Sequence, residues 1–191
     1  MRRGLWILAG IALAAVLVIG LTQAGGKQVT TSSRPFDLAA AQRKLQHAPG
    51  PLAGLYAQAN QLLGGPPAME RRLLALRGHP VVVNKWASWC RPCRAEFPIF
   101  QRVAAARGTK VAFVGLNGKD KAPAAKRFLA AEPLPYPSYQ DPDEVVASRL
   151  KVPGFYPETV FLDGQGRIQF THTGEYTSEQ QLTRDIDRYL G

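Results

Sequence analysis

Cysteine, methionine and histidine are scarce in this sequence, which has two Cys, two Met and three His among its 191 residues. Two Cys cannot form a scaffold of several disulfides or a zinc site with four Cys ligands. The three His are scattered along the chain, and we expect neither a metal site nor a bound cofactor. With 46% hydrophobic residues, the chain is not wholly disordered. What remains is one close pair of thiols, Cys90 and Cys93.

Acidic residues are outnumbered, with 14 Asp and Glu against 24 Lys and Arg and a formal net charge of +10. Such an excess could indicate a nucleic-acid partner. The basic residues, however, are dispersed as pairs at 43–44, 71–72 and 126–127, without a dense patch or interleaved aromatic residues. We therefore expect no nucleic-acid binding and interpret the excess as surface charge near a membrane.

The amino-terminal region contains an apolar run from Leu5 to Leu21 that has no charge and no proline. Arg2 and Arg3 precede it, a pattern typical of a spanning segment whose amino terminus stays in the cytoplasm. We expect residues 1–24 to be a membrane anchor or an uncleaved signal, with a removed signal as the alternative. The rest of the chain would then lie outside the cytoplasm, on the periplasmic or cell-surface side, where thiols oxidise easily.

Two segments of different character follow. Residues 25–35 are polar and contain Gly, Thr and Ser, which predicts a linker. Residues 36–79 have helix-like apolar spacing interrupted by Pro and Gly, which predicts a helical extension without evident chemistry. Its helices are expected at 36–47, 52–63 and 69–76.

After residue 80 the sequence changes to short apolar runs that alternate with helical segments. The β-branched run at 81–86 predicts a buried strand, and 91–107 predicts a helix that ends at Gly108. The order continues as β-α and then as β-β-α with an antiparallel hairpin. We assign the proline-rich stretch 132–142 to a loop. The remaining segments are strands expected at 110–116, 159–162 and 167–171, and helices expected at 123–131, 143–150 and 178–190.

Cys90 and Cys93 lie where the strand at 81–86 gives way to the next helix. Two intervening residues bring both sulfurs within bonding distance across the first helical turn. The free N–H groups of that turn, together with Arg91, favour a thiolate at Cys90. Cys93 should be more buried and should react second. This arrangement predicts dithiol–disulfide exchange through a mixed disulfide at Cys90.

Three other interpretations of the cysteine pair explain less. A structural disulfide that closes so short a loop would stabilise the fold only weakly. Half of a zinc site would lack its other two ligands. Two buried thiols without a function would not account for their position between a strand and a helix.

The segment from Asn84 to Pro98, NKWASWCRPCRAEFP, resembles the active-site segment of TlpA-like thioredoxin-fold proteins. Its pattern WxSWCxPCRxExP is far more restrictive than a lone C-x-x-C, and the resemblance covers about 81–189. It implies an α/β domain of thioredoxin-like fold over residues 80–191, with a central mixed sheet flanked by helices. Proteins of this family are membrane-anchored thiol–disulfide oxidoreductases, several of which serve cytochrome c maturation.

The resemblance implies an extracytoplasmic oxidoreductase that works as a reductant, with apocytochrome c cysteines among its candidate substrates. Its expected partners are substrate proteins with thiols or disulfides and a membrane thiol electron donor, and the chain is expected to be a monomer. A copper-carrying chaperone is the alternative, with His172 as the candidate third ligand. A peroxidase on the same fold would need a single peroxidatic Cys in a loop with Pro and Thr, which the sequence lacks.

The family also implies a cis-proline that faces the disulfide, and Pro157, just before a predicted strand, matches that position. Pro153 is the competing choice, but it lies farther from the strand. A cis bond would leave backbone groups of Tyr156 free to hold a partner peptide. We expect Trp89, Tyr156 and Arg91 to contact the partner.

Glu96 matches a carboxylate that lies near the disulfide in this family. It follows Cys93 by three residues, so both lie on one helix face, where Glu96 could exchange protons with Cys93. The alternative is a solvated Glu96 paired with Arg91 or Arg94.

Two neighbouring residues depart from the expected pattern. Asn84 stands where thioredoxin has a buried acid, which makes Glu96 the candidate replacement. Lys85 interrupts an apolar strand, and we expect it either to face solvent or to pair with Glu96.

Overall fold

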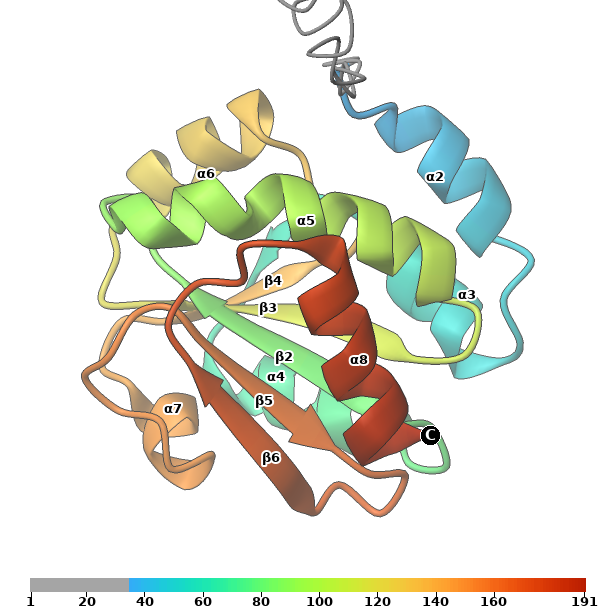
Figure 1. Cartoon of the computed structure of the whole chain (residues 1–191). Helices are drawn as coiled ribbons and strands as arrows, with labels where there is room; N and C mark the ends of the chain where they lie inside the picture. The colour runs from blue at the N-terminus through green and yellow to red at the C-terminus, as the bar shows by residue number, and fades with distance from the viewer. Residues whose placement is uncertain (1–34) are drawn as a thin grey trace, which may run out of the picture. The chain divides into compact units, whose positions relative to one another are not determined.

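A six-stranded sheet in the order β1-β4-β3-β2-β5-β6 forms the centre of the computed structural model, which describes residues 35–191 (Figure 1). β1 to β4 pair in parallel, whereas β5 pairs antiparallel with β2 and with β6. The sheet is therefore mixed, as the sequence predicts. The strands are β1 (Leu62–Leu63), β2 (Val81–Trp86), β3 (Ala112–Gly118), β4 (Ser138–Asp141), β5 (Glu158–Leu162) and β6 (Ile168–Thr173).

Helices cover both faces of this sheet. α5 and α8 lie together on one face, and α4 and α7 lie on the other (Figure 1). The helices are α2 (Leu38–Leu45), α3 (Pro51–Tyr56), α4 (Pro66–Ala75), α5 (Arg91–Arg107), α6 (Ala122–Ala131), α7 (Val145–Arg149) and α8 (Glu179–Leu190).

All six residues of β2 are buried, because the strand has a partner on each side and lies between the helices of the two faces. Successive side chains of a strand point to opposite faces, and β2 follows this rule. Trp86 points to the α5 face, where its ring packs 5.2 Å from Phe97 and 5.7 Å from Phe128 of α6. Asn84 shares that face, and Lys85 points to the other. This alternation sets the two environments at the site.

The strongest sequence patterns are confirmed. The strand at 81–86 and the helix at 91–107 occur with the predicted bounds. Ser178 caps α8, with its hydroxyl accepting a hydrogen bond from the Gln181 N–H. These segments combine a clear apolar period with a clear start signal.

Two predicted assignments are wrong. The helix expected over 52–63 ends at Tyr56, because the chain turns at Asn60, with φ of 61°, and then forms β1 against β4. The Asn60 side chain holds this turn by bonds to the backbone of Leu129 and Leu134. The expected loop over 132–142 contains β4, since three of its prolines precede the strand and Pro142 follows it, so that the ladder stays intact.

The expected anchor at residues 1–24 and most of the expected linker lie outside the described residues. Within residues 35–191, no helix combines the length and the apolar run needed to cross a membrane. Residues 36–79 supply a strand of the sheet as well as α2, α3 and α4. The domain boundary expected near residue 80 stays a prediction.

Candidate active site

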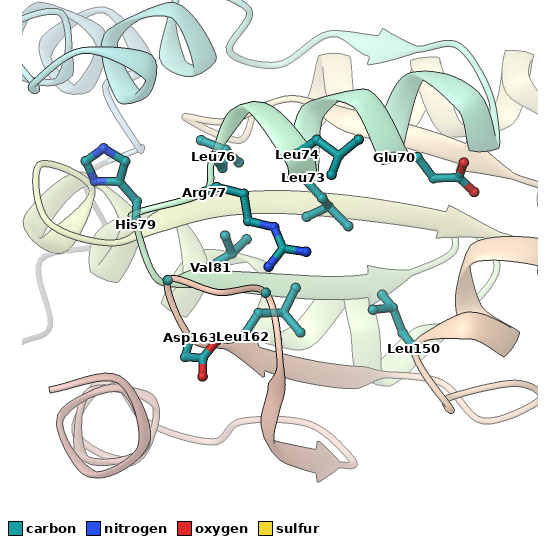
Figure 2. Close-up of a pocket in the computed structure, with 12 residues that line it drawn as sticks. Glu70, Leu73, Leu74, Leu76, Arg77, His79, Val81, Leu150, Leu162 and Asp163 are labelled. Atoms are coloured by element: carbon teal, nitrogen blue, oxygen red, sulfur yellow. The ribbon is translucent and has the colours of Figure 1, made fainter.

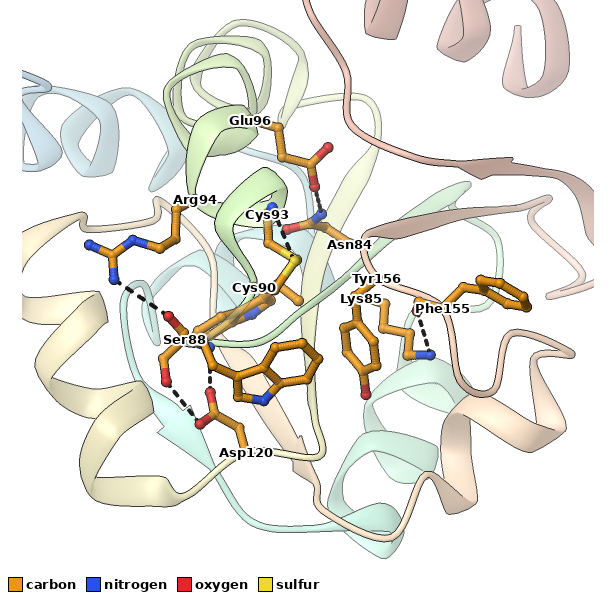
Figure 3. Close-up of a disulfide and its surroundings, with 12 residues drawn as sticks. Asn84, Lys85, Ser88, Cys90, Cys93, Arg94, Glu96, Asp120, Phe155 and Tyr156 are labelled. Carbon is orange, nitrogen blue, oxygen red and sulfur yellow. Dashed lines mark hydrogen bonds between the residues drawn. A yellow bond between two sulfur atoms is a disulfide. The ribbon is translucent and has the colours of Figure 1, made fainter.

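The two cysteines form a disulfide at the start of α5 (Figure 3). Cys90 is the N-cap residue, and its sulfur accepts a hydrogen bond from the Cys93 N–H at 3.2 Å. Cys90 is 3% exposed and Cys93 is fully buried, so the bond meets solvent only on the Cys90 side. The expected bond is present. The positive end of the helix lies at Cys90, which would stabilise a thiolate there.

Trp89, which directly precedes Cys90, is an exposed aromatic residue. Its side chain is 58% exposed, and its indole N–H donates to the Lys119 carbonyl at 2.8 Å. Its ring lies 5.1 Å from the ring of Tyr156. Arg91 is exposed on the first turn of α5. The expected contact of Trp89, Tyr156 and Arg91 with a partner stays a prediction.

Asp120 holds the loop that leads into Cys90. Its carboxylate accepts hydrogen bonds from the Ser88 N–H at 2.5 Å and from the Ser88 hydroxyl at 2.8 Å. The Asn117 amide donates to the same carboxylate at 3.0 Å. Because Asp120 follows β3 and Ser88 follows β2, these bonds join the ends of two neighbouring strands. The backbone around Trp89 is thereby fixed before α5 begins.

The peptide bond between Tyr156 and Pro157 is cis, as the resemblance implies, and it is the only cis bond in residues 35–191. The competing choice, Pro153, is trans. Pro157 is directly followed by β5, which pairs with β2. The loop from Val152 to Tyr156 therefore ends at the strand next to the one that leads to Cys90. A catalytic role of Pro157 stays a prediction.

Glu96 is fully buried on α5 and accepts two hydrogen bonds from neutral donors. One donor is the Asn84 amide at 2.8 Å (Figure 3), and the other is the Tyr176 N–H at 3.0 Å. Burial raises the pKa of Glu96 to about 8, and the two hydrogen bonds oppose that shift only in part. The alternative of a solvated Glu96 paired with Arg91 or Arg94 is therefore wrong.

Asn84 completes this side of the site. While its amide nitrogen bonds Glu96, its buried Oδ1 has no hydrogen-bond partner within the described part of the chain. A buried acceptor without a partner is unusual in a folded protein.

Lys85 is fully buried and points away from Glu96, so both placements expected from the sequence are wrong. The cause is the antiparallel pairing of β2 with β5, which sets Lys85 opposite Glu158. Its ammonium group lies 2.9 Å from Glu144 and 3.6 Å from Glu158. It also lies 4.1 Å from the centre of the Tyr156 ring, a cation–π contact.

Glu144 is the acidic centre of this second cluster. It accepts hydrogen bonds from the Tyr156 hydroxyl at 2.8 Å and from the Gly154 N–H, and it pairs with Lys119 at 2.9 Å. Burial alone would raise the pKa of Glu144, but the bonds from Lys85, Lys119, Gly154 and Tyr156 outweigh it and lower the pKa to about 2. The pKa of Glu158, in contrast, is raised by burial, which the charge of Lys85 only partly offsets.

Sequence reasoning missed Glu144, Lys119 and Asp120. A signal was available, because all three follow the carboxyl ends of β3 or β4. In a parallel sheet these ends meet at one edge, and Cys90 follows the end of β2 at the same edge. Ordering the strands first would have brought these polar residues to the disulfide.

A hollow lies at the start of β2, at the opposite end of the strand from the disulfide (Figure 2). It has a volume of about 310 Å³ and lies between α4 and the β5–β6 hairpin. Five of its twelve lining residues are leucines, and Arg77, just after α4, reaches into it (Figure 2). Val81, the first residue of β2, lines this hollow, whereas Cys90 lies beyond the last residue of the same strand. We assign no chemistry to it.

The metal-carrier alternative finds no support in the described region. No group of three or more potential ligands among His, Cys, Asp and Glu comes together in residues 35–191. His172, the candidate third ligand, stacks on Tyr176 with ring centres 4.1 Å apart and lies 4.0 Å from Asp185. Its surroundings are those of a packed ring.

Comparison with known proteins places this geometry among disulfide-exchanging proteins. The family model described as Redoxin matches residues 69–187. Thiol:disulfide interchange protein DsbE of Yersinia pestis is 41% identical over 118 residues, which are 60% of this chain and 61% of the relative. Thiol:disulfide interchange protein HelX of Rhodobacter capsulatus is 37% identical over 110 residues, 57% of this chain and 60% of the relative. The chain thus spans about three fifths of the length of these curated relatives.

One solved structure shows the same arrangement of strands and helices. It is a secreted disulfide oxidoreductase of Mycobacterium tuberculosis, homologous to DsbE of E. coli, with a TM-score of 0.54 and 29% identity. The match covers 60% of this chain and 85% of that chain. Together with the mixed sheet, it confirms the expected thioredoxin-like fold of the α/β class.

Proposed function

Because the chain belongs to the Redoxin family, we propose that it is a thiol–disulfide oxidoreductase that acts on protein partners. The observation that carries this proposal is the Cys90–Cys93 disulfide at the start of α5, which meets solvent only on the Cys90 side while Cys93 is fully buried. One sulfur can be reached by a partner, and the other can be reached only by Cys90. This asymmetry suits a two-step exchange.

In the reducing direction, the Cys90 thiolate attacks one sulfur of a partner disulfide and releases the other sulfur as a thiolate. A mixed disulfide now joins Cys90 to the partner. The Cys93 thiol loses its proton and attacks the Cys90 sulfur, which releases the second partner sulfur as a thiolate. The partner gains two electrons, and the Cys90–Cys93 disulfide forms. The opposite sequence returns the protein to its reduced form at the expense of a donor dithiol.

Glu96 is suited to exchange the proton of Cys93. With a pKa of about 8, its carboxyl group is mostly protonated at neutral pH in the oxidised form. It can therefore give a proton to the Cys93 sulfur as a donor thiolate breaks the disulfide. In the reducing direction the ionised carboxylate takes the proton back. Asn84 of β2 orients the Glu96 carboxyl group through its amide.

We further propose that the protein works outside the cytoplasm as a reductant, with apocytochrome c cysteines as a candidate substrate. The resemblance of the segment from Asn84 to Pro98 supports the reducing direction. The apolar run near the amino end supports the location outside the cytoplasm. Electrons would come from a membrane thiol donor. Trp89, Tyr156 and Arg91 would contact the substrate chain, and Pro157 would present the backbone of Tyr156.

A trapping experiment with the full chain tests the exchange. Cys93→Ser should stay joined to partner proteins through Cys90, and the bands should disappear on addition of a reductant. A variant with both cysteines replaced by Ser is the matched control. Wild type should also reduce insulin disulfides. If Cys93→Ser traps no more than the control and wild type leaves insulin oxidised, the proposal is wrong.

The direction is tested separately by the reduction potential of the dithiol. A value near about −120 mV, as in strongly oxidising members of the wider fold, would contradict a reductant while leaving the exchange chemistry intact.

A further inference from the structure

The ion cluster on the Lys85 side of β2 has no part in the exchange steps, yet it is buried beside them. Lys85 is fully buried, and Glu144 is 5% exposed. Burying such charges is costly unless each has partners in good geometry. Here the partners come from four separate segments: the end of β3, the turn before α7, the loop at 152–156 and the start of β5.

The Lys85 side chain binds the backbone of the loop at 152–156. The ammonium group donates to the carbonyl oxygens of Val152 and Phe155, the latter at 3.0 Å. Its charge also lies over the ring of Tyr156. One side chain thus holds the loop at its beginning and near its end.

Glu144 binds the same loop from the other side. It accepts from the Gly154 N–H at 3.1 Å and from the Tyr156 hydroxyl at 2.8 Å. Gly118 makes room for this hydroxyl, because a Cβ at that position would collide with it. Together, Lys85 and Glu144 tie four of the five residues from 152 to 156.

The cluster extends to the residue next to Cys90. Lys119 pairs with Glu144 through its side chain, and its carbonyl accepts the indole N–H of Trp89. The rings of Trp89 and Tyr156 are in contact. The loop at 152–156 and Trp89 are therefore held by one connected set of bonds.

These segments present aromatic side chains to solvent. Phe155 is 68% exposed and Trp89 is 58% exposed, although both are large and apolar. Exposed aromatic residues on a rigid support are typical of protein-binding surfaces. A polypeptide bound at Cys90 could contact both, whereas a small disulfide needs only access to the sulfur.

We propose that Lys85 and Glu144 are positioning residues that hold residues 152–156 and Trp89 as a preformed edge for polypeptide partners, and so favour exchange with proteins over exchange with small disulfides. This inference rests on the proposed function. A loop that is already ordered loses little conformational entropy when a partner binds. Without the cluster, the entropy lost in ordering the loop would weaken the binding of every protein partner.

The test compares two substrates of the reduced full chain, insulin and bis(hydroxyethyl) disulfide. The quantity measured is the ratio of kcat/KM for insulin to kcat/KM for the small disulfide. Lys85→Met keeps most of the length of the side chain and removes the charge. We expect it to lower the ratio about tenfold, mainly through a higher KM for insulin. Lys110→Met is the matched control, since Lys110 is exposed beyond the other end of β3 and should leave the ratio unchanged.

A second variant covers the case in which Lys85→Met does not fold. Lys119→Met removes a half-exposed partner of Glu144 and should lower the ratio about threefold. A ratio within about twofold of wild type in the folded variants would overturn the inference, as would an equal loss on both substrates. If wild type reduces neither substrate, the proposed function fails instead.

Discussion

Two buried carboxylates lie on opposite sides of β2 and differ in the protonation that their surroundings favour. Glu96 faces Asn84, and its pKa is raised to about 8. Glu144 faces Lys85, the next residue of the strand, and its pKa is lowered to about 2. Burial is the largest influence on both groups and raises the pKa of each.

The difference between the two carboxylates lies in their donors. Glu96 has two neutral donors, which stabilise the ionised form too weakly to offset burial. Glu144 has two Lys side chains in addition to a backbone N–H and a hydroxyl. The charge of the donors, neutral around Glu96 and cationic around Glu144, thus separates a group that can exchange protons from one that stays charged.

The largest expected effect comes from removing the cation. Lys85→Met leaves Glu144 and Glu158 buried with only part of their partners, and breaking a buried pair in this way costs about 3 to 5 kcal/mol. We expect that loss in the free energy of unfolding, measured with urea at pH 7. Lys110→Met should change it by less than about 0.5 kcal/mol. A loss below about 1 kcal/mol for Lys85→Met would mean that Lys119 alone satisfies Glu144.

The Glu96 side should respond to pH instead. Its pKa is 4.5 in the unfolded chain and about 8 in the folded one. Between these values the folded protein holds one more proton than the unfolded chain, so the free energy of unfolding falls as pH rises. The expected slope is about 1.4 kcal/mol per pH unit, or up to about 4 kcal/mol from pH 5 to pH 8.

Glu96→Gln cannot titrate and should lose this slope. The measurement is urea unfolding of wild type and variant at pH 5, 6, 7 and 8, with the difference plotted against pH. The difference should move in favour of the variant as pH rises. Glu132→Gln, at the surface end of α6, is the control, and its difference from wild type should stay flat. A flat difference for Glu96→Gln would show that Glu96 is ionised across the whole range.

The sequence predicts the surroundings of Glu96 in part but gives no indication of the cluster of Lys85 and Glu144. Glu96 is visible because it follows Cys93 on one helix, where residue spacing translates directly into proximity. Lys85 and Glu144 are far apart in the chain and meet only because β4 and β5 lie on either side of β2 and β3. Local patterns contain no information on that strand order.

The same distinction holds for the fold. β2 and α5 were predicted with correct bounds, since a β-branched run and a long amphipathic segment are strong local signals. β1 has two residues, Leu62–Leu63, and exists only by pairing with β4. β4 itself was hidden by the prolines before it. Both strands depend on a distant partner, which no single segment specifies.

The smallest expected effect separates the ionic part of the Glu144 cluster from its neutral part. Tyr156→Phe removes the hydroxyl that donates to Glu144 and keeps the ring against Trp89 and beneath the Lys85 charge. One hydrogen bond to a charged group is lost, and we expect a decrease of about 1.5 kcal/mol in the free energy of unfolding at pH 7. Tyr189→Phe, whose ring also stacks on an aromatic neighbour, is the control and should change it by less than about 0.5 kcal/mol. No decrease for Tyr156→Phe would mean that the two Lys side chains alone keep Glu144 ionised. A decrease as large as that of Lys85→Met would mean that the hydroxyl is as important as the cation. The contrast between the two sides of β2 would then rest on the number of donors and not on their charge.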